Sequence, residues 1–222
     1  DVRGAAIGNK YMESLYSGVN VTEEDAKAYY DEQLAAKKAE YAETPAQFYT
    51  DYSNAISGSD TVGVLTVPEG YRFCKHILIK KAEEGDTTKN VNQIVEEVKA
   101  KLADGVDFDK LVEEYGEDPG MKNEAYKNGY LTYAGDTGFV TEFADACAAL
   151  TEDGMTSGLV GSDFGYHIIR RVSTVPSGEA TFEDVKDSLM ESMLTDKKST
   201  TYDQQVEAWV KEVNPDIKTD KL

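Results

Sequence analysis

The sequence has no apolar run near the roughly 18 residues that a membrane-spanning helix needs, so we expect no transmembrane segment. It is also poor in basic residues: 42 acidic side chains stand against 23 basic ones, which leaves a net charge of -19. Nucleic acids and anionic lipid surfaces both attract cationic side chains. We therefore expect no nucleic-acid partner. The acidic surface fits a highly soluble protein, or one that attracts basic, unfolded chains.

Cysteine and histidine are scarce, with two of each. Cys74 follows a strand pattern and Cys147 lies among small residues with helical spacing. Both are predicted to be buried free thiols rather than a disulfide or a nucleophile. The chain has no GxSxG sequence, no phosphate-binding loop and no HxH, HxxxH or CxxC spacing. We therefore predict no bound metal and no cofactor.

Both ends of the chain have helical patterns, over residues 1–68 and 176–222. Thr22 with Asp25, and Thr181 with Asp184, form capping-box patterns that predict helix starts. Thr44 followed by Pro45 predicts a third start, because proline suits the first position of a helix.

After residue 180 we predict two separate amphipathic helices, over residues 182–193 and 202–213. Neither end of the chain has an obvious apolar partner of its own. The simplest arrangement packs the two ends against each other in one all-helical domain, with the central segment inserted between them.

The central segment, residues 69–175, changes in character. YRFCKHILIK alternates and is rich in β-branched and aromatic residues, which predicts a strand with Cys74, His76 and Leu78 on one face. Two helical patterns, a short strand near residues 130–133, a helix capped by Thr141 and a last strand at residues 165–172 follow. This order of strands and helices along the chain predicts an α+β fold with an antiparallel sheet and surrounding helices.

The two histidines lie in the first and last strands of this segment. If these strands pair, His76 and His167 meet on one face of the sheet. A strand histidine is often only a hydrogen-bonded core residue, and two histidines together would suggest a partial metal site. The residue pattern alone does not choose among these interpretations.

The blocks CKHILIK, GVDFDKLVEEYGED, TEFADACAAL, DGMTSGLV and SDFGYHIIRRV resemble the parvulin (rotamase) family. The resemblance covers almost all of residues 71–172. It implies a parvulin-type fold and peptidyl-prolyl cis/trans isomerase activity, which needs neither metal nor cofactor.

The resemblance also assigns site residues. It implies that His76 and His167 are the paired active-site histidines, that Asp118 takes a position held by Cys or Asp in the family, and that Ser162 is the small hydroxyl residue before the second histidine. Three apolar residues are implied to hold the proline ring: Leu131, Phe139 and Phe143.

The chain departs from the family pattern at residues 128–132, NGYLT, where a GGDLG-like stretch is usual and the alignment is ambiguous by a residue or two. The loop after the first strand carries Lys80, Lys81 and Lys89 among acidic residues and lacks an arginine-rich cluster. We therefore expect no preference for phosphoserine-proline.

The helical ends, VTEEDAKAYYDEQLAAKKAEY and TFEDVKDSLMESMLTDKK, look like those of PrsA-like and SurA-like extracytoplasmic foldases. The resemblance implies a bacterial envelope or secreted location. Because the chain does not begin with methionine, we expect a removed upstream segment, for which a signal, a lipid anchor and a mere cloning boundary are the alternatives. We also consider a homodimer as a partner state.

The function expected from the sequence is that of a prolyl isomerase and foldase for unfolded or partly folded proteins with Xaa-Pro bonds. A first alternative is a chaperone whose parvulin domain has little activity and serves as a peptide-binding module, which the altered stretch at residues 128–132 would favour. A second alternative is a structural or adhesion protein that uses the fold as a spacer.

Overall fold

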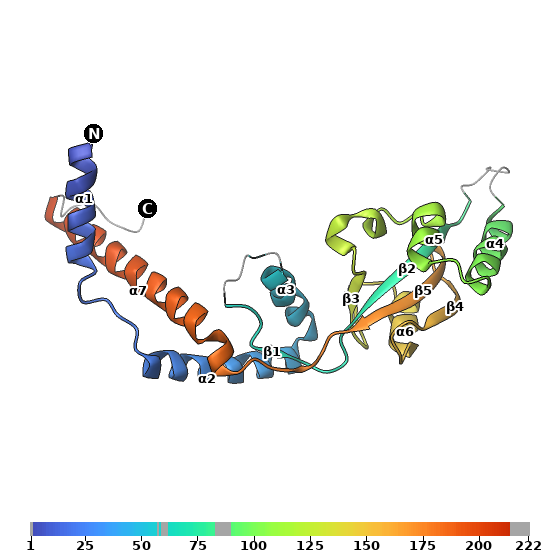
Figure 1. Ribbon diagram of the computed structural model, residues 1–222, viewed down its shortest axis with the longest axis horizontal. Coiled ribbons are helices and arrows are strands. Elements are labelled where there is room, and N and C mark those ends of the chain that lie inside the picture. Colours follow the sequence, from blue (N-terminus) through green and yellow to red (C-terminus); the bar gives the residue numbers. More distant parts are fainter. Residues whose placement is uncertain (1, 57, 59–61, 83–89, 214–222) are drawn as a thin grey trace. The chain divides into compact units, whose positions relative to one another are not determined.

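The computed structural model describes residues 2–56, 58, 62–82 and 90–213. The chain divides into two compact units. A helical unit is formed by Asp1–Thr66 together with Glu179–Leu222, and a central unit by Val67–Gly178. The mixture of helices and antiparallel strands confirms the α+β prediction (Figure 1). Residues 83–89, and with them Lys89, lie outside the described residues.

The described part of the helical unit contains α1 (Val2–Leu15), α2 (Glu23–Glu43), α3 (Pro45–Ile56) and α7 (Phe182–Val213). The start of α2 is a capping box: Thr22 Oγ1 accepts from the N–H of Asp25 at 3.1 Å, and Asp25 Oδ2 accepts from the N–H of Thr22 at 3.2 Å. Thr181 and Asp184 make the same reciprocal pair before α7. Both predicted helix starts are therefore confirmed.

The prediction of two helices after residue 180 was wrong, because α7 runs without a break through 32 residues (Figure 1). No glycine or proline interrupts Phe182–Val213. The polar stretch between the two apolar patterns therefore continues the helix, since polarity alone does not end one.

The core of the helical unit joins the two ends of the chain. Ala26 and Tyr30 of α2 cluster with Val185 and Leu189 of α7 and with Leu65. Tyr30 also donates its hydroxyl to the carbonyl of Ala180 at 2.6 Å. Burying these apolar faces supplies the packing that neither amphipathic helix has alone.

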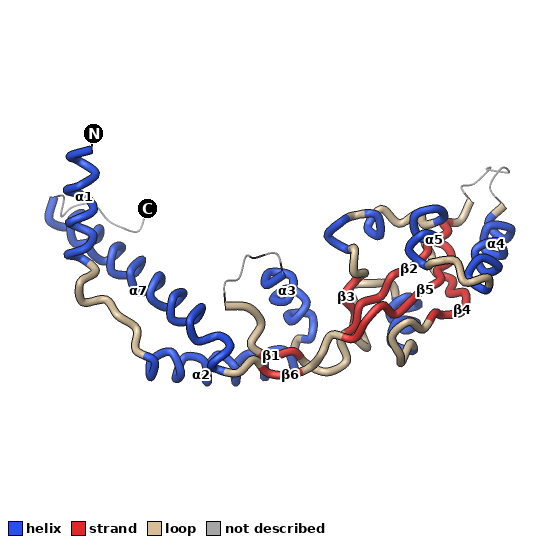
Figure 2. Tube along the Cα trace, viewed as in Figure 1, coloured by secondary structure: helices blue, strands red, loops and turns tan. Residues whose placement is uncertain are grey.

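The central unit is built on a four-stranded antiparallel sheet of order β3-β2-β5-β4 (Figure 2). Its strands are β2 (Arg72–Lys80), β3 (Tyr130–Thr132), β4 (Thr156–Gly161) and β5 (Gly165–Thr174). The first and last long strands, β2 and β5, pair side by side, which meets the condition for His76 and His167 to share a face. Two short strands, β1 (Thr66–Val67) and β6 (Gly178–Glu179), form a separate sheet where the chain passes between the units.

The two faces of the four-stranded sheet have different covers. Helices α4 (Val91–Ala103) and α5 (Phe108–Tyr115) pack on the face that presents Ile77 and Ile79. Helix α6 (Thr141–Ala149) packs on the face that presents Cys74 and Ile169. Alternation along β2 separates these two sets of side chains.

Helix α6 differs from the prediction at its start. Its N-cap is Val140, not Thr141, and no side chain makes a capping hydrogen bond there. At the other end, Arg72 Nη1 of β2 donates to the carbonyls of Cys147 at 3.2 Å and Ala148 at 3.0 Å. An arginine suits this position because the last carbonyls of a helix lack partners and carry partial negative charge.

Candidate active site

His76 and His167 meet as the strand pattern predicts. In the β2–β5 ladder His76 lies opposite Ile169 and His167 opposite Leu78, so the two imidazoles are diagonal neighbours on the face covered by α6. Their Nδ1 atoms are 2.9 Å apart and the ring planes differ by 11°. Both side chains are buried.

Asp118, in the segment after α5, binds the first of these rings. Its Oδ2 lies 2.7 Å from His76 Nε2 and accepts from the Tyr130 hydroxyl at 2.8 Å. Its Oδ1 accepts from the N–H of Gly120 at 3.0 Å. Three donors from three different segments thus hold one carboxylate in place.

Ser162 binds the second ring. Its Oγ lies 2.7 Å from His167 Nε2 and accepts from the N–H of Phe164 at 3.2 Å. The turn that carries Ser162 closes on Gly165, whose φ is 147°. A Cβ at Gly165 would lie 2.2 Å from the carbonyl oxygen of Ile79, so only glycine lets β5 start this close to β2.

One set of proton positions satisfies all these contacts with both imidazoles neutral. Ser162 donates to His167 Nε2, His167 Nδ1–H donates to His76 Nδ1, and His76 Nε2–H donates to Asp118. All four ring nitrogens then have partners inside the protein. The histidines therefore form a fixed polar floor, with no N–H directed at a substrate.

Electrostatics agree with this arrangement. The hydrogen bond from His76 holds the pKa of Asp118 well below its usual range, and Tyr130 and Gly120 add to the effect although burial opposes it. Burial, with repulsion from His76, lowers the pKa of His167 to about 4, although Asp118 pulls the other way. At neutral pH Asp118 is therefore a carboxylate and His167 is uncharged.

A cavity of about 420 Å³ opens above this floor. His76, Asp118 and His167 line its polar side, and aromatic rings line the rest, including those of Tyr130, Phe139, Phe143 and Phe164. Phe143 lies with its ring centroid 5.0 Å from that of His76 and 5.2 Å from that of Phe139. These aromatic side chains form a mainly apolar slot. The slot is large enough for one small cyclic group together with the peptide groups on either side of it.

Leu131 was expected in this slot, but the structure places Tyr130 there instead. Tyr130 lies opposite Cys74 in the β2–β3 ladder and so shares the histidine face, whereas Leu131 lies opposite Phe73 and is buried on the other face. A shift of one residue in a three-residue strand exchanges the two faces. The other six predicted site residues come together: His76, Asp118, Ser162, His167, Phe139 and Phe143.

Tyr130, Leu78 and Phe164 line the cavity and were not predicted as site residues. Leu78 follows His76 at the period of a strand, so the same-face pattern was a signal for it. Within the described ranges, no group of three or more His, Cys, Asp or Glu side chains is placed to hold a metal ion.

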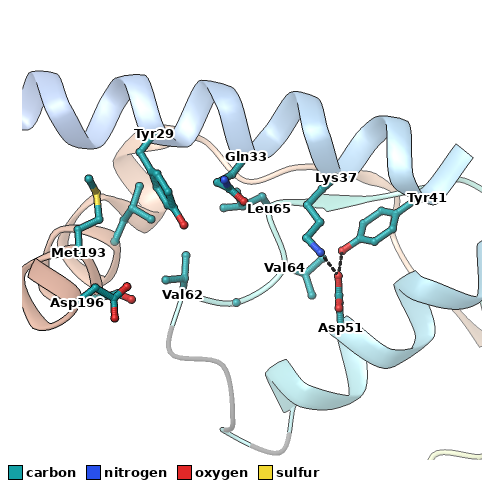
Figure 3. A pocket seen from close by; sticks show the side chains of 13 residues that line it. Tyr29, Gln33, Lys37, Tyr41, Asp51, Val62, Val64, Leu65, Met193 and Asp196 are labelled. Atoms are coloured by element: carbon teal, nitrogen blue, oxygen red, sulfur yellow. Dashed lines mark hydrogen bonds and ion pairs between the residues drawn. The ribbon is translucent and has the colours of Figure 1, made fainter. Parts of the chain in front are cut away.

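The helical unit has a cavity of its own, of about 220 Å³ (Figure 3). One face of α2 supplies Tyr29, Gln33, Lys37 and Tyr41, and α7 supplies Met193 among others. The remaining lining residues are Asp51, Val62, Gly63, Val64, Leu65, Leu189, Ser192 and Asp196.

At one end of this cavity Lys37 and Tyr41 point to Asp51 of α3 (Figure 3). Asp51 accepts from Lys37 Nζ at 2.7 Å, from the Tyr41 hydroxyl at 2.7 Å and from Gln47 Nε2 at 2.9 Å. Although burial raises it, these hydrogen bonds together lower the pKa of Asp51. The carboxylate is thus neutralised locally, and the rest of the cavity has a mixed lining of apolar side chains with Gln33, Ser192 and Asp196.

Comparison with known proteins now identifies the class. Residues 76–173 match the rotamase family, described as the PPIC-type PPIASE domain. The central unit is therefore a parvulin-type domain, as the resemblance implied.

The chain as a whole is similar to Foldase protein PrsA. It is 27% identical over 213 residues to PrsA of Clostridium tetani, which covers 95% of this chain and 58% of that protein. It is 27% identical over 210 residues to PrsA of Clostridium botulinum strain Hall, which covers 95% of this chain and 51% of that protein. The chain thus spans little more than half the length of these relatives.

Among solved structures, the fold matches a chain from PEB4 and the periplasmic protein Cj1289, two structurally related SurA-like chaperones of Campylobacter jejuni. The TM-score is 0.52 at 21% identity, over 97% of this chain and 71% of that chain. This likeness shows the fold. Among the described residues, none of the helices combines the length and the apolar character needed to cross a membrane.

Proposed function

We propose that this protein is a peptidyl-prolyl cis/trans isomerase that acts as a foldase on unfolded or partly folded proteins with Xaa-Pro bonds. One observation carries the proposal: the chain of hydrogen bonds from Asp118 through His76 and His167 to Ser162 forms the floor of an aromatic cavity. The PPIC-type domain match and the similarity to PrsA support it.

The reaction is a rotation about an amide bond, with no bond made or broken. Its barrier, about 18–20 kcal/mol, comes from amide resonance, which the twisted transition state loses. The planar amide is also more dipolar than the twisted one, so an apolar environment favours the twisted state relative to water. The site therefore needs to hold the proline ring and keep water away, and needs no nucleophile.

The side chains divide this work. Phe139 and Phe143 pack around the proline ring, and Tyr130 occupies the position expected for Leu131. His76 and His167, with every ring nitrogen bonded internally, keep the floor rigid and of fixed polarity. Asp118 at the rim places a negative charge where it disfavours the negative carbonyl oxygen of the planar amide.

Phe143→Ala tests the cavity directly. Turnover of an Xaa-Pro peptide in a chymotrypsin-coupled assay should fall by on the order of 100-fold, since the ring that contacts both histidines is lost. Circular dichroism must show a folded variant, and Phe143→Leu keeps most of the packing if it does not. Tyr202→Ala, an exposed aromatic of the helical unit, is the matched control. Unchanged turnover in the folded Phe143 variants would rule out this cavity.

A second candidate function is a peptide-binding module with little catalysis. The altered stretch at residues 128–132 favours it, because this stretch places the Tyr130 hydroxyl on Asp118 at 2.8 Å. Binding of a proline peptide to the cavity, seen as shifts of the His76 and His167 NMR signals without measurable isomerisation, would select this function over the first.

We propose that the helical unit, built from the segments predicted as 1–68 and 176–222, holds unfolded clients, while the segment predicted as 69–175 performs the isomerisation. Its cavity is lined by Tyr29, Leu189 and Met193 and has room for an apolar side chain. The test is suppression of aggregation of a chemically unfolded protein. A chain that isomerises peptides but gives no protection in this assay would confine the function to the central unit.

Specificity and location complete the proposal. We propose no preference for phosphoserine-proline, because the described residues at this end of β2 offer only Lys80, the last residue of the strand, and Lys81 as basic side chains. Matched peptides with Ala, Glu or phosphoserine before proline should be turned over within a few-fold of one another. An extracytoplasmic location is a prediction from the resemblance, and a lipid anchor and a homodimer are further predictions; membrane fractionation and sedimentation of the natural protein would test them.

A further inference from the structure

The two cysteines lie on the histidine face of the sheet, next to the candidate active site. Cys74 and Cys147 are both fully buried and belong to one core cluster with Phe143, Leu150 and Ile169. Both are free thiols, and the shared cluster brings their side chains together from β2 and α6. The catalytic proposal uses neither of them.

Other contacts fix the backbones that carry this thiol pair. Arg72, two residues before Cys74 on β2, donates from Nη1 to the carbonyl of Cys147 at 3.2 Å. Thr132 of β3 directs its Oγ1 to Cys74 Sγ at 3.7 Å and to the carbonyl of Arg72 at 3.5 Å. The C-terminal end of α6 is therefore held against the part of β2 that carries Cys74.

We propose that Cys74 and Cys147 are an oxidisable pair that forms a disulfide between β2 and α6 and thereby regulates the adjacent isomerase site. The two cysteines are far apart in the sequence, and the packing of α6 on the sheet brings their side chains together. The bond formation rests on this contact alone, and its effect on turnover rests on the proposed isomerase function.

The chemistry is thiol–disulfide exchange with a small dialkyl disulfide such as oxidised glutathione as the oxidant. The Cys74 thiolate attacks one sulfur of glutathione disulfide and releases one glutathione thiolate. Cys147 then loses its proton to solvent and attacks Cys74 Sγ, which releases the second glutathione. The protein gives up two protons and two electrons, and the oxidant becomes two molecules of glutathione.

The order of these steps follows from the environment of each thiol. The hydrogen bond from Cys147 lowers the pKa of Cys74 against the effect of burial, and Thr132 and Arg72 act in the same direction. The neighbouring Cys74 and burial raise the pKa of Cys147. Both thiols are buried, so the oxidant reaches them when this part of the structure opens transiently.

A disulfide here would act on the site through short connections. His76 lies two residues after Cys74 on β2, and Phe143 lies four residues before Cys147, one turn along α6. A covalent bond between the two sulfur atoms draws α6 towards β2 and changes the spacing of Phe143 and His76, whose ring centroids are now 5.0 Å apart. We expect kcat/KM for a proline peptide to fall by roughly tenfold.

The experiment incubates the reduced full chain with oxidised glutathione and follows its mass. The expected product has lost two hydrogen atoms and yields a peptide that joins Cys74 to Cys147 on non-reducing digestion. Dithiothreitol restores the starting mass and the turnover. Cys147→Ser is the matched control, and should give either a glutathione adduct on Cys74 or no reaction.

Two results would overturn the proposal. If conditions that fully oxidise the urea-unfolded chain leave both thiols open to alkylation in the folded chain, or give only mixed disulfides and intermolecular dimers, the pair does not form. If the internal disulfide forms but turnover stays the same, the regulatory part is wrong. Since the covalent product is measured by mass, it is detected even in a chain without isomerase activity.

Discussion

The cavity of each unit contains a hydrogen-bonded aspartate, but the partners of the two aspartates differ. In each, one aspartate accepts three hydrogen bonds: Asp118 from His76, Tyr130 and Gly120, and Asp51 from Lys37, Tyr41 and Gln47. The partner of Asp51 is a lysine, so the pair is permanently charged and simply neutralised. The partner of Asp118 is an imidazole that in turn accepts a hydrogen bond from a second imidazole.

This difference indicates different roles. In the central unit His76, His167 and Asp118 are joined by hydrogen bonds and form one side of an otherwise mainly aromatic cavity. In the helical unit the network of Asp51 lies at one end, and apolar side chains line the rest of the cavity together with Gln33, Ser192 and Asp196 (Figure 3). Changes at matched positions in the two cavities should therefore separate isomerisation from holding.

The largest expected effect is on stability, through His167. Its pKa is about 4 in the folded chain against 6.5 in the unfolded chain, so the folded state binds fewer protons between these values. Stability is then fully present above about pH 6.5 and is lost as the pH falls towards 4, by about 3 kcal/mol. Asp51, an acid whose pKa is lowered, contributes a loss only at more acidic pH.

Urea unfolding at pH 7 and pH 4.5 measures this loss. Trp209 is the only tryptophan and reports on the helical unit by fluorescence, whereas histidine NMR signals report on the central unit. We expect the central unit to lose stability first as the pH falls from 7 to 4.5. Equal losses in both units would show that His167 is not the cause.

Asp118→Asn should have the next largest effect, on turnover. The carboxylate of Asp118 accepts from three donors, whereas an asparagine amide has one acceptor oxygen and an NH₂ group that can only donate. At least one of the three hydrogen bonds is therefore lost, and the chain of hydrogen bonds is broken. We expect kcat/KM to fall by on the order of 100-fold, or about 2.7 kcal/mol. Asp51→Asn breaks the matching network in the helical unit and should leave turnover of a short peptide within about twofold. Similar losses in both variants would contradict the division of roles.

A smaller effect is expected when the helical cavity is filled. Ser192→Trp places a large ring among Tyr29, Leu189 and Met193. Protection of an aggregating client should then weaken by about tenfold, since an apolar side chain of the client no longer fits. Ser188→Trp, on the same helix but outside the cavity lining, is the matched control. Equal protection by both variants would exclude this cavity as a holding site.

The smallest effect is expected for Ser162→Ala. The change removes the hydroxyl that donates to His167 Nε2 and leaves the N–H of Phe164 without its acceptor. A neutral hydrogen bond contributes about 0.5–1.5 kcal/mol, so turnover should fall about two- to tenfold. Steady-state kinetics on the same peptide measures it, and Ser53→Ala, a hydroxyl on α3, provides the comparison. A complete loss of activity would give Ser162 a larger role than proposed.

Strand alternation placed the two histidines on one face, whereas Asp118, Ser162, Phe139 and Phe143 were assigned by the family resemblance. The two histidines lie on strands long enough to fix which face each residue takes, and β2 and β5 pair along nearly their whole length. Leu131 could not be placed in the same way, since β3 has only three residues and a shift of one exchanges its faces. Tyr130 was therefore missed although it is the adjacent residue.

The remaining differences have similar causes. The break expected in α7 rested on a polar stretch, and polar residues without glycine or proline do not end a helix. The contact of Cys74 with Cys147 depends on how α6 packs on the sheet, which no local pattern in the sequence encodes. Local patterns thus predicted elements and faces, and tertiary packing determined which side chains of different elements meet.

Gly165 has a consequence for how this sequence can vary. Gly165 has no side chain, yet it constrains the histidine pair. Any Cβ at this position would collide with the backbone of Ile79 on the neighbouring strand. A side chain would push β5 away from β2 and separate the two Nδ1 atoms without touching either ring. In a library of random variants, Gly165 should therefore be as intolerant of change as the histidines, and its loss should be rescued by no second substitution in the cavity.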